Sequence, residues 1–164
     1  MALVIEDGTV VAGANSYITD QEFVDYANAR GYEIPAAEAD REPLIIKAAD
    51  YILSQESKMQ GVRTDPVNQT MSYPRSGAYL YCTLIASDAI PQTLKNAQCE
   101  AAFAVSSTDL LITKSSGNIA SEAVGDLSVS YHSGGSFEQV RTDTIDVHLD
   151  PLLKQGGANV MTRF

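Results

Sequence analysis

The sequence has no tryptophan, only two cysteines, and 11 lysine and arginine residues against 21 aspartate and glutamate residues. The formal net charge of −10 argues against a protein that holds nucleic acid by neutralising phosphates, because that requires clustered Lys and Arg. The acidity fits equally well with simple solubility, or with a surface that repels DNA or meets a basic partner. Cys82 and Cys99 form neither a disulfide framework nor a CxxC metal site, and we expect both to be reduced in a cytosolic product.

The motifs of common enzymes and cofactor sites are also missing. No GxxxxGK[ST], GxGxxG or GxSxG pattern occurs. His132 and His148 have no histidine or cysteine partner at ligand spacing, so we expect no metal site. Asp143 and Asp146 are interpreted as solvated charges rather than as an acid–base pair. The sequence therefore predicts a protein that is not an enzyme and uses no cofactor.

Long apolar runs are absent as well. The first residues, MALVIEDGTV, lack the basic start and the apolar run of a signal peptide. No other run is long enough to span a bilayer, so we expect no membrane partner.

What the chain does contain is helical hydrophobic spacing in its first two thirds. Thr19 and Glu22 form a capping-box pattern that opens a first helix, and Gly31 is placed to end it. A second helix is predicted from Asp40, as its N-cap, to the neighbourhood of Met59. Its apolar stripe consists of Leu44, Ile45, Ala48, Ala49, Ile52 and Leu53. A third helix follows Pro91, with a narrow apolar face made by Leu94, Ala97, Ala101 and Val105.

Residues 61–89, between the second and third helices, are predicted to form one long loop. Loops of this length inside compact domains are usually functional or disordered, and the aromatic content argues against disorder. The residues expected to anchor the loop are Met71, Tyr73, Tyr79 and Tyr81.

The last third is rich in serine and glycine. Val124, Leu127, Val129 and Tyr131 partly alternate, which predicts an exposed strand or hairpin arm, and residues 144–157 predict one short helix before a C-terminal tail. The predicted fold is mainly α, a small bundle of three to four helices with a long inserted loop, a short β-like extended arm and a tail. We divide it into residues 1–112, the bundle core with an N-terminal extended segment and the 61–89 loop, and residues 113–164, the arm, short helix and tail.

The order of five segments is more specific than any one of them. EDGTVVAGANSYIT is followed by EPLIIKAADYIL, GVRTDPVNQTMSYPRSG, AIPQTLKNAQCEAA and VGDLSVSY. Across roughly residues 5–155 they resemble a family encoded in tailed-bacteriophage genomes, found in the head-to-tail neck region and commonly described as DnaT-like single-stranded DNA-binding proteins. Its architecture is similar to that of head–tail adaptor (connector) proteins, which dock as a ring under the portal. In that family the loop usually reads Leu-x-Trp-Pro-Arg; here Met71 and Tyr73 stand at the Leu and Trp positions, and Pro74 and Arg75 are kept.

The resemblance implies two competing functions. A single-strand binder needs aromatic residues along a basic groove, and the charge balance argues against such a groove. We therefore interpret the chain as a structural virion protein of the neck, made in the host bacterial cytoplasm. It would form a dodecameric ring with copies of itself between the portal protein and the next neck or tail protein, and DNA would pass through without specific binding. A replication accessory that binds single-stranded DNA and a head-associated scaffold remain as alternatives.

Two groups of residues are predicted to make contacts in such a ring. In the loop, Tyr73 is expected to pack onto the bundle and Pro74 to fix the turn, while Arg63 and Arg75 form ion pairs within the loop or across a subunit boundary. A loop held only by its own bundle fits equally well. The tail is expected to bind the portal through Asn159, Val160, Met161, Thr162, Arg163 and Phe164.

Overall fold

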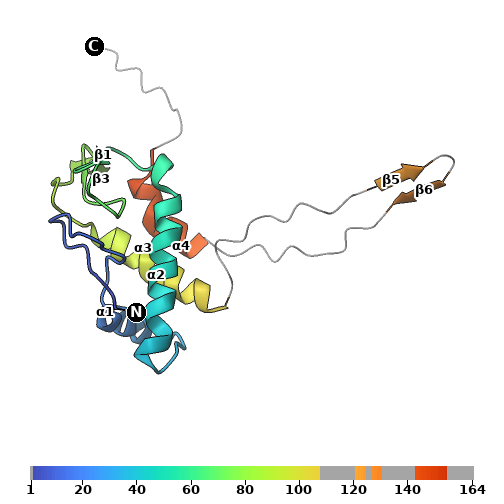
Figure 1. Cartoon of the computed structure of the whole chain (residues 1–164), viewed down its shortest axis with the longest axis horizontal. Coiled ribbons are helices and arrows are strands. Elements are labelled where there is room, and N and C mark those ends of the chain that lie inside the picture. The colour runs from blue at the N-terminus through green and yellow to red at the C-terminus, as the bar shows by residue number, and fades with distance from the viewer. Residues whose placement is uncertain (1, 108–120, 125–126, 131–142, 155–164) are drawn as a thin grey trace, which may run out of the picture.

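Four helices and three small antiparallel sheets make up the described part of the structure (Figure 1). It is a computed structural model that describes residues 2–107, 121–124, 127–130 and 143–154. The helices are α1 (Asp20–Arg30), α2 (Glu38–Ser54), α3 (Gln92–Ser107) and α4 (Asp143–Leu149). Helix α3 packs against α2 and α4, and α1 packs against α2 and α3. The predicted mainly α bundle is confirmed. None of the helices in the described ranges is long and apolar enough to cross a membrane.

Helix α1 begins and ends as its sequence predicts. The backbone N–H of Glu22 donates to Thr19 Oγ1 at 3.1 Å, and the backbone N–H of Thr19 donates to the Glu22 carboxylate at 2.7 Å. These two bonds satisfy amide groups that have no partner inside the helix. At the other end, Gly31 adopts a left-handed conformation with φ of 70°.

Helix α2 differs from its prediction at both ends. Its N-cap is Ala37, which makes no side-chain cap, and Asp40 lies inside the first turn instead. The guanidinium of Arg41 donates to the carbonyl oxygens of Pro35 and Ala36, which fixes the chain just before the helix. The helix stops at Ser54, and a 3₁₀ turn, η1 (Glu56–Lys58), leads on to Met59.

The segment predicted as one long loop contains four short strands. β1 (Val62–Arg63) pairs with β2 (Arg75–Ser76), and β3 (Tyr79–Leu80) pairs with β4 (Thr83–Leu84), both antiparallel. Each strand is two residues long, too short to produce a readable alternation in the sequence. The predicted hairpin arm is confirmed in the described strands β5 (Ser121–Val124) and β6 (Leu127–Ser130), which pair antiparallel. The predicted short helix is α4, followed by the 3₁₀ turn η2 (Asp150–Leu152).

A buried glutamine joins three parts of the core. Gln98 of α3 is fully buried; its side-chain amide donates to Ser16 Oγ at 2.9 Å and to the carbonyl of Ile45 at 3.0 Å. Its side-chain oxygen accepts from the backbone N–H of Tyr17 at 2.9 Å. The apolar core around it is formed mainly by Tyr17, Ile18, Phe23, Ile45, Ile52, Met59, Tyr73, Leu94, Ile145, Leu149 and Leu152. A buried amide with all these partners fixes the N-terminal segment, α2 and α3 in one arrangement.

The N-terminal segment makes a tight turn over the residues that precede α3. The buried carboxylate of Glu6 accepts hydrogen bonds from the backbone N–H groups of Gly8, Val10 and Val11. Gly8 has φ of 108°, and a Cβ there would lie 1.8 Å from the carbonyl oxygen of Asp88. Both the conformation and the space therefore require glycine at this position.

We predict that Gly8→Ala lowers the free energy of unfolding by more than about 2 kcal/mol, because the methyl group meets backbone that cannot move cheaply. The matched control is Gly13→Ala, since Gly13 has φ of 72° and open space within 4 Å of its Cβ position. The control substitution should lower the free energy of unfolding by only about 1–2 kcal/mol, which is the cost of placing a non-glycine residue in the left-handed conformation. Urea denaturation measures both, and equal losses in the two variants would contradict the close approach of Gly8 to Asp88.

Candidate functional site

Arg75 fastens the segment after α2 to the bundle. Its side chain is almost fully buried, and its guanidinium donates to oxygens from three stretches of chain. Nε donates to the carbonyl of Gln60 at 2.6 Å, Nη2 to the carbonyl of Gly61 at 2.8 Å, and Nη1 to the carbonyl of Ser72 at 3.1 Å. Nη1 also lies 3.2 Å from the carboxylate of Glu56. The planar group reaches all four acceptors at once, which a lysine ammonium would not do.

Glu56 of η1 receives a second arginine. Arg63 donates to both carboxylate oxygens of Glu56, with Nε at 2.6 Å from Oε1. Hydrogen bonds from Arg63 and then Arg75 hold the pKa of Glu56 below its ordinary value, and the same pairing raises the pKa of Arg63. Arg63 and Arg75 were expected to form ion pairs within the loop or across a subunit boundary. Their partner is Glu56 of the same chain, which lies just before the loop.

Tyr73 and Pro74 lie inside the bundle. Tyr73 is fully buried, its backbone N–H donates to the Tyr17 hydroxyl at 3.0 Å, and the Tyr73–Pro74 peptide bond is cis. The Pro74 carbonyl accepts from the side-chain amide of Gln69 at 3.0 Å. These contacts hold the segment to its own bundle, and a contact with a second copy stays a prediction. The six tail residues predicted to bind a portal, residues 159–164, lie outside the described residues.

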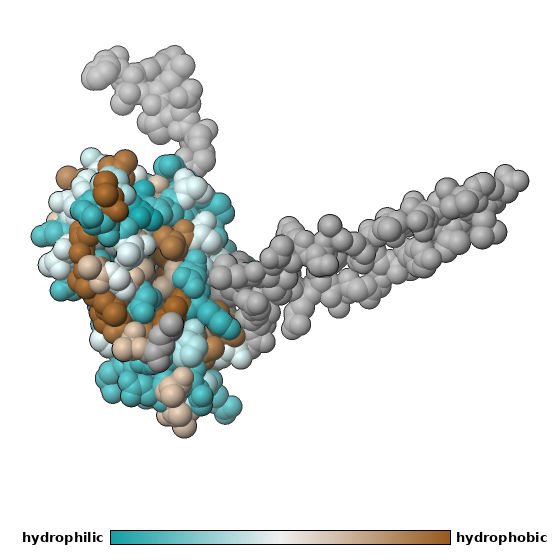
Figure 2. Space-filling view, viewed as in Figure 1, coloured by the Kyte–Doolittle hydropathy of each residue, from teal (hydrophilic) through white to brown (hydrophobic). Residues whose placement is uncertain are grey.

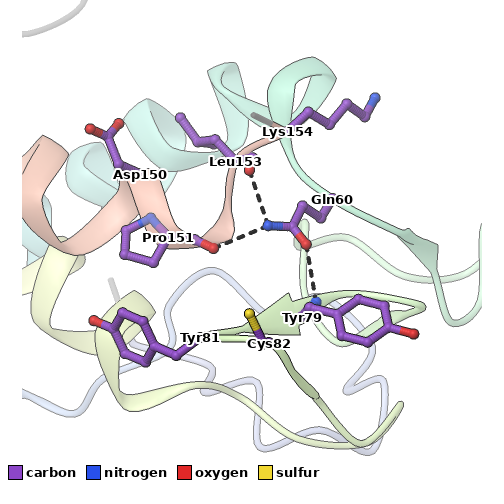
Figure 3. A pocket seen from close by; sticks show the side chains of 8 residues that line it. All are labelled: Gln60, Tyr79, Tyr81, Cys82, Asp150, Pro151, Leu153 and Lys154. Carbon is purple, nitrogen blue, oxygen red and sulfur yellow. Dashed lines mark hydrogen bonds between the residues drawn. The ribbon is translucent and has the colours of Figure 1, made fainter. Parts of the chain in front are cut away.

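A groove of about 1140 Å³ opens next to this fastened segment (Figure 3). One wall is the β3–β4 hairpin, which contributes Tyr79, Tyr81 and Cys82. The opposite wall is η2 and the residues after it, which contribute Asp150, Pro151, Leu153 and Lys154. Gln60 lies between the two walls.

Gln60 holds the walls at a fixed separation. Its side-chain nitrogen donates to the carbonyl oxygens of Pro151 and Leu153, both at 3.1 Å, and its side-chain oxygen accepts from the backbone N–H of Tyr79 at 3.1 Å. Its own backbone N–H donates to the carbonyl of Leu152 at 3.0 Å. Because Arg75 binds the Gln60 carbonyl, the groove is built directly on the Arg75 contacts described above.

The hairpin presents two tyrosines to solvent. Tyr79 is 49% exposed and Tyr81 is 74% exposed, whereas Met71 and Tyr73 are buried. The prediction that all four anchor the loop is therefore wrong for Tyr79 and Tyr81. Tyr81 and Cys82 form the turn of the hairpin with φ of 49° and 66°. Two-residue hairpin turns need such angles and normally use Asn and Gly, so a tyrosine here costs about 1–2 kcal/mol and points to a role other than stability.

The basic side chains differ in their availability to a ligand. Among the described residues, salt bridges occupy Arg30, Arg41, Arg63, Arg75 and Lys95. Lys58 and Lys154 instead donate to neutral oxygens, those of the Gln55 side chain and the Ser57 carbonyl. The two lysines are neighbours, since the Lys154 backbone N–H donates to the Lys58 carbonyl at 2.7 Å. Both are exposed, and Lys154 lines the groove on its η2 side.

Several exposed acids lie far from the groove, although Asp150, which is also exposed, lines it. Figure 2 shows hydrophilic residues covering the end formed by α1 and the start of α2, while apolar residues come to the surface toward the end that carries β1 to β4. Exposed acids at the hydrophilic end include Glu33, Glu38 and Asp40. An α2 of 17 residues spans about 25 Å, so these charges lie beyond the Debye length from the groove at physiological salt.

An exposed tyrosine pair in a groove that a lysine also lines is a surface suited to single-stranded nucleic acid. The model of the family described as "Putative DnaT-like ssDNA binding protein" matches residues 1–164. The chain belongs to this DnaT-like family. No curated protein and no solved structure matches it.

The match to the DnaT-like family overturns the interpretation as a head-to-tail virion adaptor. It agrees with the alternative kept above, a protein that binds single-stranded DNA, and it gives no support to portal or ring partners. The sequence-based inference failed because it applied the net charge of −10 to the whole surface, whereas DNA binding depends on the local charge at the site.

The remaining sequence candidates stand apart from the groove. His148 of α4 is half-buried, with Nε2 3.4 Å from the Tyr26 hydroxyl. Cys99 is buried in α3, and burial raises the pKa of its thiol to about 12. Within the described ranges no group of three His, Cys, Asp or Glu side chains is placed to hold a metal ion. Sequence reasoning missed Gln60, Lys58 and Lys154, because no local motif marks a glutamine that bridges residues 79 and 153.

We predict that Glu56→Gln lowers the free energy of unfolding at neutral pH by about 2 kcal/mol, since two charge-assisted interactions are weakened. The folded-state pKa of Glu56 lies below its ordinary value of 4.5, so its contribution is present above that pH and is lost as pH falls through the lowered pKa. The difference between wild type and variant should therefore shrink as pH drops below 4.5. Urea denaturation across this range measures it, and a difference that does not change with pH would contradict the ionic role of Glu56.

Proposed function

We propose that this protein binds single-stranded DNA in the groove between the β3–β4 hairpin and η2. The observation that carries the proposal is the exposure of Tyr79 and Tyr81 on one wall of a groove whose other wall includes Lys154. Lys58 is joined to Lys154 by a backbone hydrogen bond. Unpaired bases would stack on the tyrosine rings, and phosphates would lie against the two ammonium groups. Membership of the DnaT-like family supports the same function. The proposal is one of binding, without catalysis.

Stacking rather than charge supplies most of the affinity in this proposal. Each base stacked on an aromatic side chain contributes about 1–3 kcal/mol and every base has a suitable face. Two lysines release few counterions, so the electrostatic part is small. Duplex DNA hides its bases in its own stack, so the groove should prefer single strands.

We predict that Tyr81→Ala weakens binding of a single-stranded oligonucleotide by about 1–3 kcal/mol, the range found for one lost stacking contact. Tyr81→Phe is the matched control, because it keeps the ring at the same strained turn and removes only the hydroxyl. Fluorescence anisotropy measures both affinities, and circular dichroism checks that both variants are folded. Equal affinity of wild type, Tyr81→Ala and Tyr81→Phe would contradict a stacking role for this residue.

We predict that the affinity for single-stranded DNA depends only weakly on salt concentration, and that the two lysines set this dependence. With two phosphates neutralised, the plot of log K against log salt should have a slope of about −1.4 for a single strand. The double variant Lys58→Gln/Lys154→Gln should bring this slope close to zero. Lys47→Gln is the control, since Lys47 is an exposed lysine on α2 and, unlike Lys154, does not line the groove. If the control flattens the slope as much as the double variant, the phosphates do not lie beside Lys58 and Lys154.

A further inference from the structure

Gln60 is the residue through which hydrogen bonds run from one wall of the groove to the other (Figure 3). Its side-chain nitrogen donates to the carbonyl oxygens of Pro151 and Leu153 on the η2 wall, both at 3.1 Å. Its side-chain oxygen accepts from the backbone N–H of Tyr79 on the hairpin wall at 3.1 Å. Within the described ranges, no hydrogen bond joins the hairpin directly to η2 or to the residues after it. The hydrogen bonding between the walls therefore depends on one amide side chain.

The backbone of Gln60 is held as firmly as its side chain. Its N–H donates to the carbonyl of Leu152 at 3.0 Å, and its carbonyl accepts from Arg75 Nε at 2.6 Å. Both donors of the side-chain amide are used as well, so the side chain cannot turn without breaking three hydrogen bonds. These bonds organise the groove through contacts of the chain with itself.

A fixed separation of the walls changes how a strand gains its contacts. Tyr81 lines one wall and Lys154 lines the other. When the walls are tied, a strand that stacks a base on Tyr81 already holds its backbone at a set place relative to Lys154, so the second contact requires little further ordering. When the walls are free to move, each contact has to order its own wall, and the two contacts contribute independently.

We propose that Gln60 is a positioning residue that makes the Tyr81 and Lys154 contacts with a single strand cooperative. The inference rests on the proposed function, because it assigns a role within that site. Gln60 acts through the two walls and not on the DNA itself, since both of its amide donors are occupied by carbonyl oxygens.

Gln69 supplies a matched control. Its side-chain nitrogen also donates to two carbonyl oxygens, those of Met71 at 2.8 Å and Pro74 at 3.0 Å, and its side-chain oxygen accepts from the backbone N–H of Asp65 at 3.3 Å. All three partners belong to the same stretch of chain as Gln69, which does not line the groove. A change to methionine at either glutamine removes three hydrogen bonds and lowers stability, but only Gln60→Met unties the walls.

The test is a double-mutant cycle measured in three backgrounds: the full-length wild type, Gln60→Met and Gln69→Met. Each background is combined with Tyr81→Ala, with Lys154→Gln and with both changes. Fluorescence anisotropy measures the affinity for oligo(dT) of about 12 nucleotides, a length that covers the site sizes usual for single-strand binders. Circular dichroism checks that each variant is folded, and urea denaturation measures its stability.

Gln60→Met should weaken binding about two- to tenfold, the effect of having to order a side chain or loop at the interface. Gln69→Met should keep the wild-type affinity although it loses stability. In the wild type, the double variant Tyr81→Ala/Lys154→Gln should lose less affinity than the product of the two single losses, by about the same two- to tenfold factor. In Gln60→Met the single losses should simply multiply, whereas the cycle in Gln69→Met should match that of the wild type.

Equal weakening of binding by Gln60→Met and Gln69→Met would overturn the proposal, because the effect would then come from lost stability alone. So would single losses that multiply in the wild type, a result that holds even if Gln60→Met does not fold. Coupling that persists unchanged in Gln60→Met would also contradict it. In these outcomes, binding that Tyr81→Ala weakens leaves the proposed function standing. Failure of the wild type to bind the oligonucleotide would overturn the proposed function together with the role of Gln60.

Discussion

The buried guanidinium of Arg75 is the contact on which the geometry of the site depends. It binds the carbonyl oxygens of Gln60, Gly61 and Ser72 and the carboxylate of Glu56. A charged group at 5% exposure is stable only where its donors are met, and here the acceptors come from chain segments with little regular structure of their own. The position of Gln60 follows from these bonds, and the separation of the two walls follows from Gln60.

In the proposed function, the same contacts explain how an acidic protein presents a site for a polyanion. Most of the basic side chains that the structure describes form salt bridges within the chain, so they stabilise the fold instead of attracting phosphate. Lys58 and Lys154 are exceptions, of which Lys154 lines the groove, and the tyrosines of the hairpin supply apolar contact area. Such a site depends on unpaired bases more than on backbone charge, and this is the physical basis for preferring single strands.

Local signals in the sequence predicted the helices well. The Thr19–Glu22 capping box, the apolar stripe of α2 and the β5–β6 hairpin were all readable, because each depends on residues close in sequence. The predicted start of α2 was wrong, because the N-cap is Ala37, which has no capping side chain. Arg41 instead fixes the preceding turn by binding the carbonyls of Pro35 and Ala36. Tyr73 was expected to pack onto the bundle, and it is buried. The exposure of Tyr79 and Tyr81 was not readable, because it depends on contacts made by residues far along the chain. The resemblance identified the right family, and the global charge then selected the wrong function within it.

The most direct test of the account is to locate the bases of a bound strand. Irradiation of the protein with an oligonucleotide containing iododeoxyuridine, followed by mass spectrometry of the peptides, identifies the aromatic residues that touch bases. The chain has no tryptophan, so tyrosine and phenylalanine are its aromatic targets. If bases stack in the groove, crosslinks are expected at Tyr81 and Tyr79. Crosslinks confined to other aromatic residues, such as the stacked pair Tyr32 and Phe103, which do not line the groove, would contradict it.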